Sequence, residues 1–430
     1  MSKRIMIIGL DGMPYRLMKK LSDDGTMPNF KKLRESSNST FTKMQSSIPE
    51  ISSVAWSSII TGKNPAEHGI YGFTEIIPGT YTLSFPNFKN LKEKPFWHQD
   101  MDKRSIIINV PSTYPAAELN GFLVSGFVAL DLERAVYPPE YAEDLEKMGY
   151  KIDVDSEKGH TSKDAFFKDL NETVENRMKL FRKLWEEKKD WDNFMFVFTG
   201  TDRLGHFLWK AFDDESHKYH KQFIEHFAML DKFIGEMTEK LREDDALIML
   251  SDHGIESIKQ NVYVNAVLRK NGFLELKENE EGKRVNYNSI SSESDAFCLD
   301  PGRIYLHKIK KYPNGSVEPG DEEKLVEQLT KLFEGLEFEG EKVIKKVFRN
   351  EDIYTGPYRD KAPDLVLLAN PGFNLRGNIA KEELFEEDIF EGKHTQDDAF
   401  LLVKTEKRDV VPNDVTVSDI VGIMKKIQGE

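Results

Sequence analysis

The sequence predicts an α/β protein with a doubly wound, mostly parallel sheet, helices on both faces and a smaller α+β insertion. Short apolar runs closed by Gly or Asp, such as residues 4–10 and 194–200, are typical of buried parallel strands. Between them, residues 164–188 carry apolar side chains at helical spacing along one face, among them Phe166, Leu170 and Val174. Strands that alternate with helices of this length indicate a doubly wound sheet.

The same patterns place the individual elements. The expected strands are residues 4–10, 105–110, 194–200, 246–251, 302–307, 364–369 and 399–404, and the expected helices are 164–188, 216–241, 321–334 and 416–427. Residues 256–360 interrupt the rhythm with a charged stretch at 277–284 and a turn at 312–315. We therefore expect a core of 1–255 and 361–430, an insertion at 256–360, and an aromatic-rich loop over the site at 71–104.

Composition and charge restrict the class of protein. A chain of 430 residues with 39% hydrophobic and 31% charged residues is typical of soluble globular proteins. No apolar run approaches the roughly 20 residues that span a bilayer, and the N-terminal run is too short for a signal peptide. Cys298 is the only cysteine, so no intrachain disulfide can form and a cytoplasmic location is expected.

The net charge of −14 argues against a dedicated nucleic-acid partner, because such a surface repels polyanions. A small phosphorylated substrate remains compatible, since two divalent ions would reverse the potential inside a pocket. The sequence carries no signal for a membrane partner or for the oligomeric state.

Three acidic residues end apolar runs. Asp11, Asp202 and Asp252 each follow an expected strand, and the carboxyl ends of parallel strands are where ligands bind in open α/β sheets. His206 lies four residues after Asp202 on the same helical face, and His253 follows Asp252 directly. Carboxylates and imidazoles gathered in this way indicate a site for two divalent metal ions.

Each signal has an ordinary alternative. Asp202 suits a helix N-cap with an incidental histidine after it, and Asp252 suits a turn beside a satisfied His253. His394, ahead of the strand at 399–404, has the sequence surroundings of an exposed loop histidine. His68 is expected to order its loop, whereas the histidines of the charged helix are expected to be solvated. These are His217, His220 and His226.

A nucleophile is expected near residue 52. Ser52 or Ser53 can cap a short helix that ends at Gly62, where backbone N–H groups would hold a phosphoryl oxygen. Coordination to a divalent ion would favour the alkoxide at neutral pH. An ordinary serine N-cap is the alternative.

An ordered set of motifs resembles the alkaline phosphatase superfamily, in particular the type I phosphodiesterase/nucleotide pyrophosphatase family. The motifs extend over nearly the whole chain, and only the set as a whole is specific. They are Gly9-Leu-Asp-Gly12, Met27-Pro-Asn-Phe-Lys-Lys-Leu33, the segments 55–70 and 109–115, Thr199-Gly-Thr-Asp-Arg-Leu-Gly-His206, Ser251-Asp-His-Gly254 and Ala362-Pro-Asp-Leu365.

The resemblance implies a two-ion centre. It assigns Asp202, His206 and His394 to one ion, and Asp11, Asp252 and His253 to the other. In the family, the nucleophile stands nine residues before the Thr-Gly that ends the helix. This spacing gives Ser52 as nucleophile and bridging ligand, with Ser53 as the alternative. The ions are expected to be Zn²⁺, with Mn²⁺ or Fe²⁺ as alternatives.

The implied function is a two-metal phosphodiesterase or pyrophosphatase that acts through a phosphoseryl intermediate on a small phosphorylated substrate. The chain departs from nucleotide-cleaving relatives at Ala55, where those place an Asn, so nucleotide specificity stays open. The alternatives are a phosphomonoesterase, phosphonate hydrolase or phosphomutase on the same centre, and a non-catalytic member that only binds phosphorylated ligands.

Overall fold

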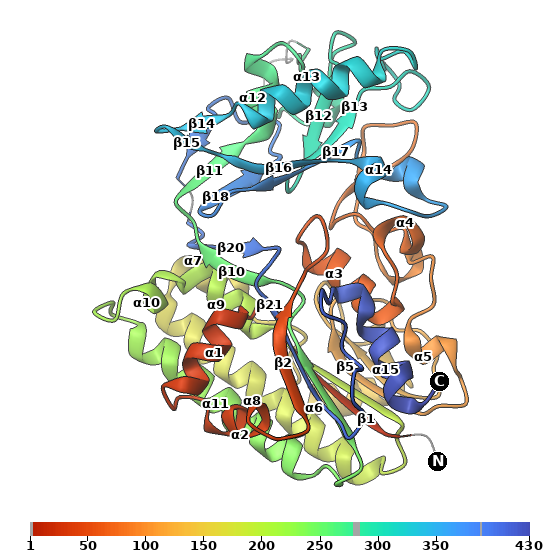
Figure 1. The fold of residues 1–430 in the computed structure, drawn as a ribbon, viewed down its shortest axis with the longest axis vertical. Coiled ribbons are helices and arrows are strands. Elements are labelled where there is room, and N and C mark those ends of the chain that lie inside the picture. Colours follow the sequence, from red (N-terminus) through yellow and green to blue (C-terminus); the bar gives the residue numbers. More distant parts are fainter. Residues whose placement is uncertain (1–2, 278–283, 388) are drawn as a thin grey trace. The chain divides into compact units, whose positions relative to one another are not determined.

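The computed structural model describes residues 3–277, 284–387 and 389–430, and the chain forms two compact units (Figure 1). The sheet unit contains Met1–Lys63, Asn87–Ser257 and Ile389–Glu430, and the insertion unit contains Asn64–Pro86 and Ile258–Asp388. These bounds differ from those expected, because 64–86 and 361–388 group with the insertion. The strand at 365–369 pairs with strands of the insertion rather than with the large sheet.

The sheet unit is built on eight strands in the order β2-β21-β9-β1-β8-β5-β6-β7. Strands β9, β1, β8, β5 and β6 run parallel, and antiparallel strands complete both edges. The predicted doubly wound, mostly parallel fold class is therefore confirmed. The strands are β1 Ile5–Leu10, β2 Ser39–Met44, β5 Ser105–Val110, β6 Gly121–Ser125, β7 Val136–Tyr137, β8 Asn193–Phe198, β9 Ala246–Leu250 and β21 Ala399–Lys404.

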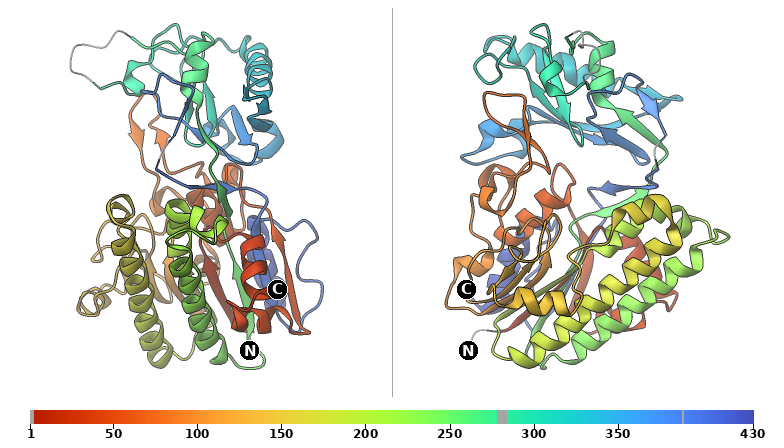
Figure 2. Two further views of the ribbon diagram at one scale, coloured as in Figure 1. Left: turned by 90° about the vertical axis from the view of Figure 1, so that its left-hand side faces the viewer. Right: turned by 180° about the vertical axis from the view of Figure 1, so that it is seen from behind.

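Helices cover both faces of this sheet (Figure 2). Met6 and Ile8 of β1 pack into a core with α8 (Lys163–Glu187) and α11 (His220–Glu239), whereas Ile5 and Ile7 pack with α3 (Ser52–Thr61) and α15 (Ile420–Gln428) on the other side. This alternation is the two-residue period of a strand buried on both faces. The other helices of the sheet unit are α1 Tyr15–Asp23, α2 Pro28–Arg34, α5 Phe96–Gln99, α6 Tyr141–Lys147, α7 Ser156–Thr161, α9 Gly200–Leu208, α10 Lys210–Asp213 and the 3₁₀ helices η1 Phe88–Asn90 and η4 Val417–Asp419.

A short antiparallel ribbon follows the central strands. Strand β10 (Gly254–Ser257) pairs with β20 (Gly392–Thr395), and Ile255 lies directly opposite His394. His394 is therefore on a strand and not in an exposed loop. The pairing brings it beside the loop that follows β9, although the whole insertion separates the two in sequence.

The insertion unit has its own four-stranded antiparallel sheet, β12-β13-β17-β16. It contains the strands expected at 302–307 and 364–369, and residues 278–283 of the charged stretch lie outside the described residues. Arg303 donates to the carbonyl of Thr74 at 2.9 Å and so binds the segment 64–86 into this unit. Its elements are β3 Glu75–Ile76, β4 Leu83–Ser84, β11 Gln260–Tyr263, β12 Ala296–Leu299, β13 Arg303–Leu306, β14 Glu337–Phe338, β15 Glu341–Lys342, β16 Ile344–Arg349, β17 Leu365–Ala369, β18 Phe373–Arg376, β19 Phe385–Glu386, α4 Pro65–His68, α12 Val264–Lys270, α13 Glu322–Glu334, α14 Asn350–Ile353, η2 Tyr287–Ser289 and η3 Arg359–Lys361.

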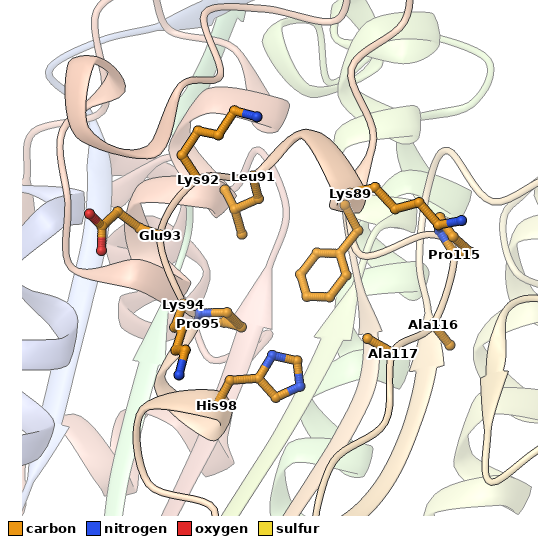
Figure 3. A pocket seen from close by; sticks show the side chains of 11 residues that line it. Lys89, Leu91, Lys92, Glu93, Lys94, Pro95, His98, Pro115, Ala116 and Ala117 are labelled. Carbon is orange, nitrogen blue, oxygen red and sulfur yellow. The ribbon is translucent and has the colours of Figure 1, made fainter. Parts of the chain in front are cut away.

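The sheet unit also contains a pocket of about 300 Å³ between residues 88–98 and 115–117 (Figure 3). Apolar side chains such as Phe88, Leu91 and Pro115 line it together with lysines, and it includes none of the expected metal ligands. Among the described residues, no helix combines the length and the apolar character that crossing a membrane requires.

His226 is buried on α11, so its expected solvation is wrong. Its side chain lies on the stripe formed by Phe223, Phe227 and Leu230, and its Nδ1 donates to Asn171 Oδ1 at 2.8 Å. Burial lowers the pKa of His226 from 6.5 to about 3. The folded state therefore holds this imidazole neutral.

The lowered pKa predicts a loss of stability in acid. The unfolded state protonates His226 near pH 6.5 and the folded state only near 3, so its contribution to the free energy of unfolding is present above 6.5 and lost as the pH falls through this window. The loss is at most roughly 5 kcal/mol. We expect His226→Gln to flatten this dependence in denaturant titrations at pH 7 and 4 in chelator, whereas His217→Gln does not. Parallel curves for wild type and His226→Gln would contradict the prediction.

Candidate metal centre

The expected nucleophile helix is α3. It begins at Ser52, after an extended Ile51 that makes no side-chain cap, and it ends at Gly62 in the left-handed region with φ 70°. The expected serine N-cap is therefore wrong, and the end at Gly62 is confirmed. The Ser52 hydroxyl instead lies 3.0 Å from Nε2 of His253, while the buried Ser53 hydroxyl has no hydrogen-bond partner among the described residues.

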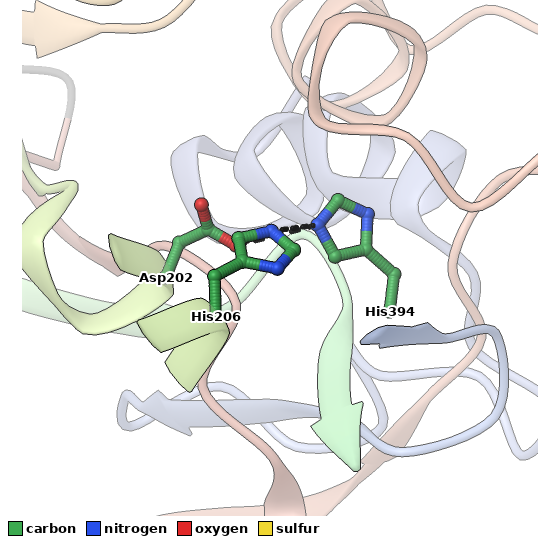
Figure 4. A group of neighbouring side chains, drawn as sticks. All are labelled: Asp202, His206 and His394. Carbon is green, nitrogen blue, oxygen red and sulfur yellow. Dashed lines mark hydrogen bonds and ion pairs between the residues drawn. The ribbon is translucent and has the colours of Figure 1, made fainter. Parts of the chain in front are cut away.

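Asp202, His206 and His394 converge on one point (Figure 4). Asp202 is in the first turn of α9 and His206 in its last turn, while His394 comes from β20. The two Nε2 atoms are 2.9 Å apart, and each is 3.3 Å from Asp202 Oδ1. Three potential ligand atoms thus face one another at distances that a shared cation would explain.

Hydrogen bonds from Nδ1 fix the tautomers of three histidines, His206, His394 and His253. Each Nδ1 donates to a backbone carbonyl: that of Gly392 at 2.8 Å, that of Glu50 at 2.8 Å and that of Gly254 at 3.0 Å, respectively. When these imidazoles are neutral, Nε2 carries a lone pair. Lone pairs 2.9 Å apart beside a carboxylate oxygen repel one another unless a positive charge lies between them.

A second group adjoins the first. Ligand atoms of Asp11, Asp202 and His253 lie within 4.8 Å of one another, so Asp202 belongs to both groups. Asp252, expected beside Asp11 and His253, reaches His253 Nε2 with its Oδ2 at 3.2 Å and accepts the amide of Gly12 with its Oδ1 at 3.0 Å. The structure thus brings the six expected metal ligands and Ser52 together at the carboxyl ends of β1, β8 and β9.

Two buried carboxylate oxygens support the fit of metal ions here. Among the described residues, Asp202 Oδ1 and Asp252 Oδ2 have no hydrogen-bond donor. Leaving such oxygens buried and unpaired costs free energy, and a cation would satisfy both. Imidazole nitrogens with carboxylate oxygens suit a borderline divalent ion such as Zn²⁺.

The pKa shifts show how crowded the charges are without metal. Burial and the charges of Asp252 and Asp202 raise the pKa of Asp11 well above its usual value. Burial lowers the pKa of His206 to about 4. Burial also opposes the charge on His394, but the adjacent carboxylate of Asp202, 3.3 Å from Nε2, outweighs it and raises the pKa of His394. Protons partly take the place that divalent ions would fill.

Two neighbours of the expected ligands were missed in the sequence. Trp56, one helical turn after Ser52, donates its indole N–H to Asp11 Oδ1 at 3.3 Å. A Cβ on Gly9 would lie 2.6 Å from the Trp56 ring, so only glycine allows this approach to β1. Arg203 donates to Asp202 Oδ2 at 3.5 Å. Trp56 lies one helical turn after Ser52, and Arg203 directly follows Asp202. This closeness in sequence to predicted site residues is the signal that would have identified both.

His68 belongs to the insertion unit. It is fully buried, and its Nδ1 accepts the amide of Ile70 at 3.2 Å. Burial lowers its pKa to about 3. This contact orders the loop after α4, as expected for His68.

The family model described as type I phosphodiesterase / nucleotide pyrophosphatase matches residues 5–397, a range that includes all seven expected site residues. The chain belongs to this family. The family is one of phosphoric ester hydrolases, and the chain is an enzyme of this class. No curated protein sequence matches the chain significantly.

Solved structures share the fold at low sequence identity. Phosphonoacetate hydrolase from Sinorhizobium meliloti 1021, in complex with phosphonoformate, has a TM-score of 0.64 at 15% identity and covers 99% of this chain and 96% of its own. Murine ectonucleotide pyrophosphatase / phosphodiesterase 5 has a TM-score of 0.55 at 12% identity, with 99% and 95% covered. Its inactive variant in complex with AMP has a TM-score of 0.56 at 12% identity, with 100% and 95% covered. At these identities the likeness shows the fold alone.

Proposed function

We propose that this family member is a two-metal phosphodiesterase or pyrophosphatase that acts through a phosphoseryl intermediate on a small phosphorylated substrate. The observation that carries the proposal is the convergence of three Nε2 lone pairs and two unpaired carboxylate oxygens beside the Ser52 hydroxyl. A cluster of this kind has no evident use in packing, because it buries acceptors without donors.

The proposed ligands follow the two groups. Asp202, His206 and His394 would hold one ion, while Asp11, Asp252 and His253 would hold the other. Zn²⁺ is the expected ion, with Mn²⁺ or Fe²⁺ as alternatives. The bound ions would supply charge stabilisation for the attacking and leaving oxygens and would favour the alkoxide of Ser52.

Ser52 would provide the nucleophile. Its Oγ forms a bond to phosphorus while the bond to the leaving oxygen breaks, and the hydroxyl proton ends on the departing alcohol. Water then hydrolyses the phosphoseryl ester and restores the hydroxyl. The start of α3 suits this role, because the backbone N–H groups of the first helical turn can hold a phosphoryl oxygen.

The charges around the site favour a diester over a monoester. Arg203 and Lys393 directly follow or precede a proposed ligand, and each is paired with a carboxylate, Arg203 with Asp153 at 2.8 Å and Lys393 with Glu256 at 3.0 Å. Neither pair adds net positive charge for a dianionic monoester. A singly charged diester needs less compensation.

Turnover of two chromogenic esters tests the proposal. With Zn²⁺ or Mn²⁺ loaded, we expect kcat/KM for bis-p-nitrophenyl phosphate to exceed that for p-nitrophenyl phosphate at least about tenfold, a difference of about 1.4 kcal/mol in transition-state stabilisation. The reverse preference would favour the phosphomonoesterase.

The structural likeness to phosphonoacetate hydrolase makes a phosphonate hydrolase the second candidate. Release of inorganic phosphate from phosphonoacetate, with neither nitrophenyl ester cleaved, would establish it. A protein that binds no metal, and whose affinity for a phosphorylated ligand is unchanged by Ser52→Ala, would instead be a non-catalytic member.

A further inference from the structure

The two oxygens of Asp202 lie in different surroundings. Oδ1 faces the Nε2 atoms of His206 and His394 at 3.3 Å each and has no hydrogen-bond donor among the described residues. Oδ2 faces Nη1 of Arg203 at 3.5 Å. One oxygen is thus open to a cation and the other is occupied by a fixed positive group.

Asp153 fixes Arg203 from the other side. Nε and Nη2 of Arg203 both donate to Asp153 Oδ2, at 3.1 and 2.8 Å, and the guanidinium lies 4.1 Å from the centre of the Phe127 ring. Asp153 Oδ1 accepts from Thr199, and the Thr199 hydroxyl accepts from the fully buried Arg177, both at 3.0 Å. A continuous chain of hydrogen bonds therefore runs from α8 to Asp202.

Asp153 lies between two arginines. It is 2.8 Å from Arg203, the two side chains being only 16% and 17% exposed, and its other oxygen is 4.0 Å from the fully buried Arg177. The contact to a buried acid that also belongs to both candidate metal groups sets this pair apart from the surface pairs of the chain.

We propose that Arg203 is a positioning residue that occupies Oδ2 of Asp202 and leaves Oδ1 alone for the ion that His206 and His394 would share. The proposal rests on the metal site of the proposed function. Without Arg203 the carboxylate is free to turn and to offer both oxygens, so metal affinity falls and the coordination number rises. Partners that orient a metal ligand in this way commonly contribute about 10- to 100-fold in affinity.

The direction in which metal affinity changes when Arg203 is replaced separates positioning from simple charge repulsion. Arg203 is a cation, and its removal alone would also remove repulsion toward a divalent ion. The double variant Asp153→Asn/Arg203→Met removes one charge of each sign and leaves the net charge unchanged. Arg182→Met is the control, because Arg182 also binds a carboxylate through two of its nitrogens, that of Glu236 at 2.7 and 2.6 Å, away from the site.

The experiment measures Zn²⁺ affinity of the metal-free full chain by competition with a chromogenic chelator, with Co²⁺ d–d absorption as a second readout. Wild type and Arg182→Met are expected to bind two ions alike. The double variant is expected to bind one of the two about 10- to 100-fold more weakly, with weaker Co²⁺ absorption because the coordination number rises.

Unchanged or tighter binding of both ions in a folded double variant would overturn the proposal while leaving the metal site intact. Absence of metal binding in wild type would overturn the proposed function as well. If the double variant does not fold, Arg203→Lys tests the proposal instead, because lysine keeps the positive charge and loses the paired N–H donors of the guanidinium. Weaker binding of one ion by Arg203→Lys would support positioning, and wild-type affinity for both ions would refute it.

Discussion

Ser52→Ala is expected to lower kcat for bis-p-nitrophenyl phosphate on the order of 10⁴-fold or more, the scale at which loss of a nucleophile acts. The Ser52 hydroxyl, at the start of α3, lies 3.0 Å from His253 Nε2. The six proposed ligands remain, so metal content stays near wild type. Initial rates with equal metal loading, verified by elemental analysis, give the comparison.

Ser53→Ala is the matched control. Ser53 is the next residue of the same helix, and its hydroxyl is buried without a partner among the described residues. Its removal leaves no donor or acceptor unsatisfied, so rate and stability should change little. A large loss of rate in Ser53→Ala with an active Ser52→Ala would assign the nucleophile to Ser53. Mass spectrometry of quenched wild type should detect a phosphoryl group on the peptide with Ser52.

The strand-ending acids were predictable because a local pattern determines them. The runs before Asp11, Asp202 and Asp252 are buried on both faces, and parallel strands bring their carboxyl ends together without further information. His394 was different. Its place depends on the pairing of β20 with β10 across the whole insertion, whereas its sequence surroundings are those of an exposed loop histidine.

The domain boundary was not predictable from periodicity. The apolar run of β17 (Leu365–Ala369) has the same appearance as a strand of the large sheet, but it pairs with β13 and β16. Burial on both faces gives a continuous apolar run in either sheet, so the pattern does not say which sheet receives the strand. The choice is made by tertiary pairing.

Two local errors have identifiable causes. His226 occupies the buried stripe of α11 at i+3 from Phe223, a position that the charged neighbours obscured. Serine commonly caps helices, but the hydroxyl of Ser52 is directed toward His253, a contact that only the folded sheet provides. The serines at its start and Gly62 at its end predicted the helix, and a tertiary contact determined which group the Ser52 hydroxyl faces.

Metal removal should have the largest effect on stability. An ion present at 1,000 times its dissociation constant stabilises the folded state by about 4 kcal/mol, so two ions contribute about 8 kcal/mol. We expect dialysis against chelator to abolish turnover and to lower the thermal midpoint, and Zn²⁺ to restore both.

Whether Asp252→Asn stabilises or destabilises the protein should depend on the presence of the metal. Without metal, Asp252 adds a like charge to buried Asp11 and raises its pKa, so Asp252→Asn relieves repulsion, and the new amide can donate to His253 Nε2 from the position of Oδ2, 3.2 Å away. We expect denaturant titrations at about pH 8 in chelator to show a gain of roughly 1–3 kcal/mol. In Zn²⁺ the same variant should be less stable than wild type, because a charged ligand is lost.

Asp231→Asn shows what an ordinary buried acid would do. Asp231 accepts the amides of Asn29 and Phe30 at 2.9 and 2.8 Å at the start of α2, where no candidate ligand lies. Its replacement should destabilise the protein by the same amount with and without Zn²⁺, since one oxygen that accepted an amide becomes a donor. If Asp252→Asn behaved like Asp231→Asn, the carboxylates at the ends of β1, β8 and β9 would be structural acids, and the metal centre would have to be abandoned. A reversal of sign confined to Asp252 requires a cation that binds there and competes with the protons that the crowded acids otherwise retain.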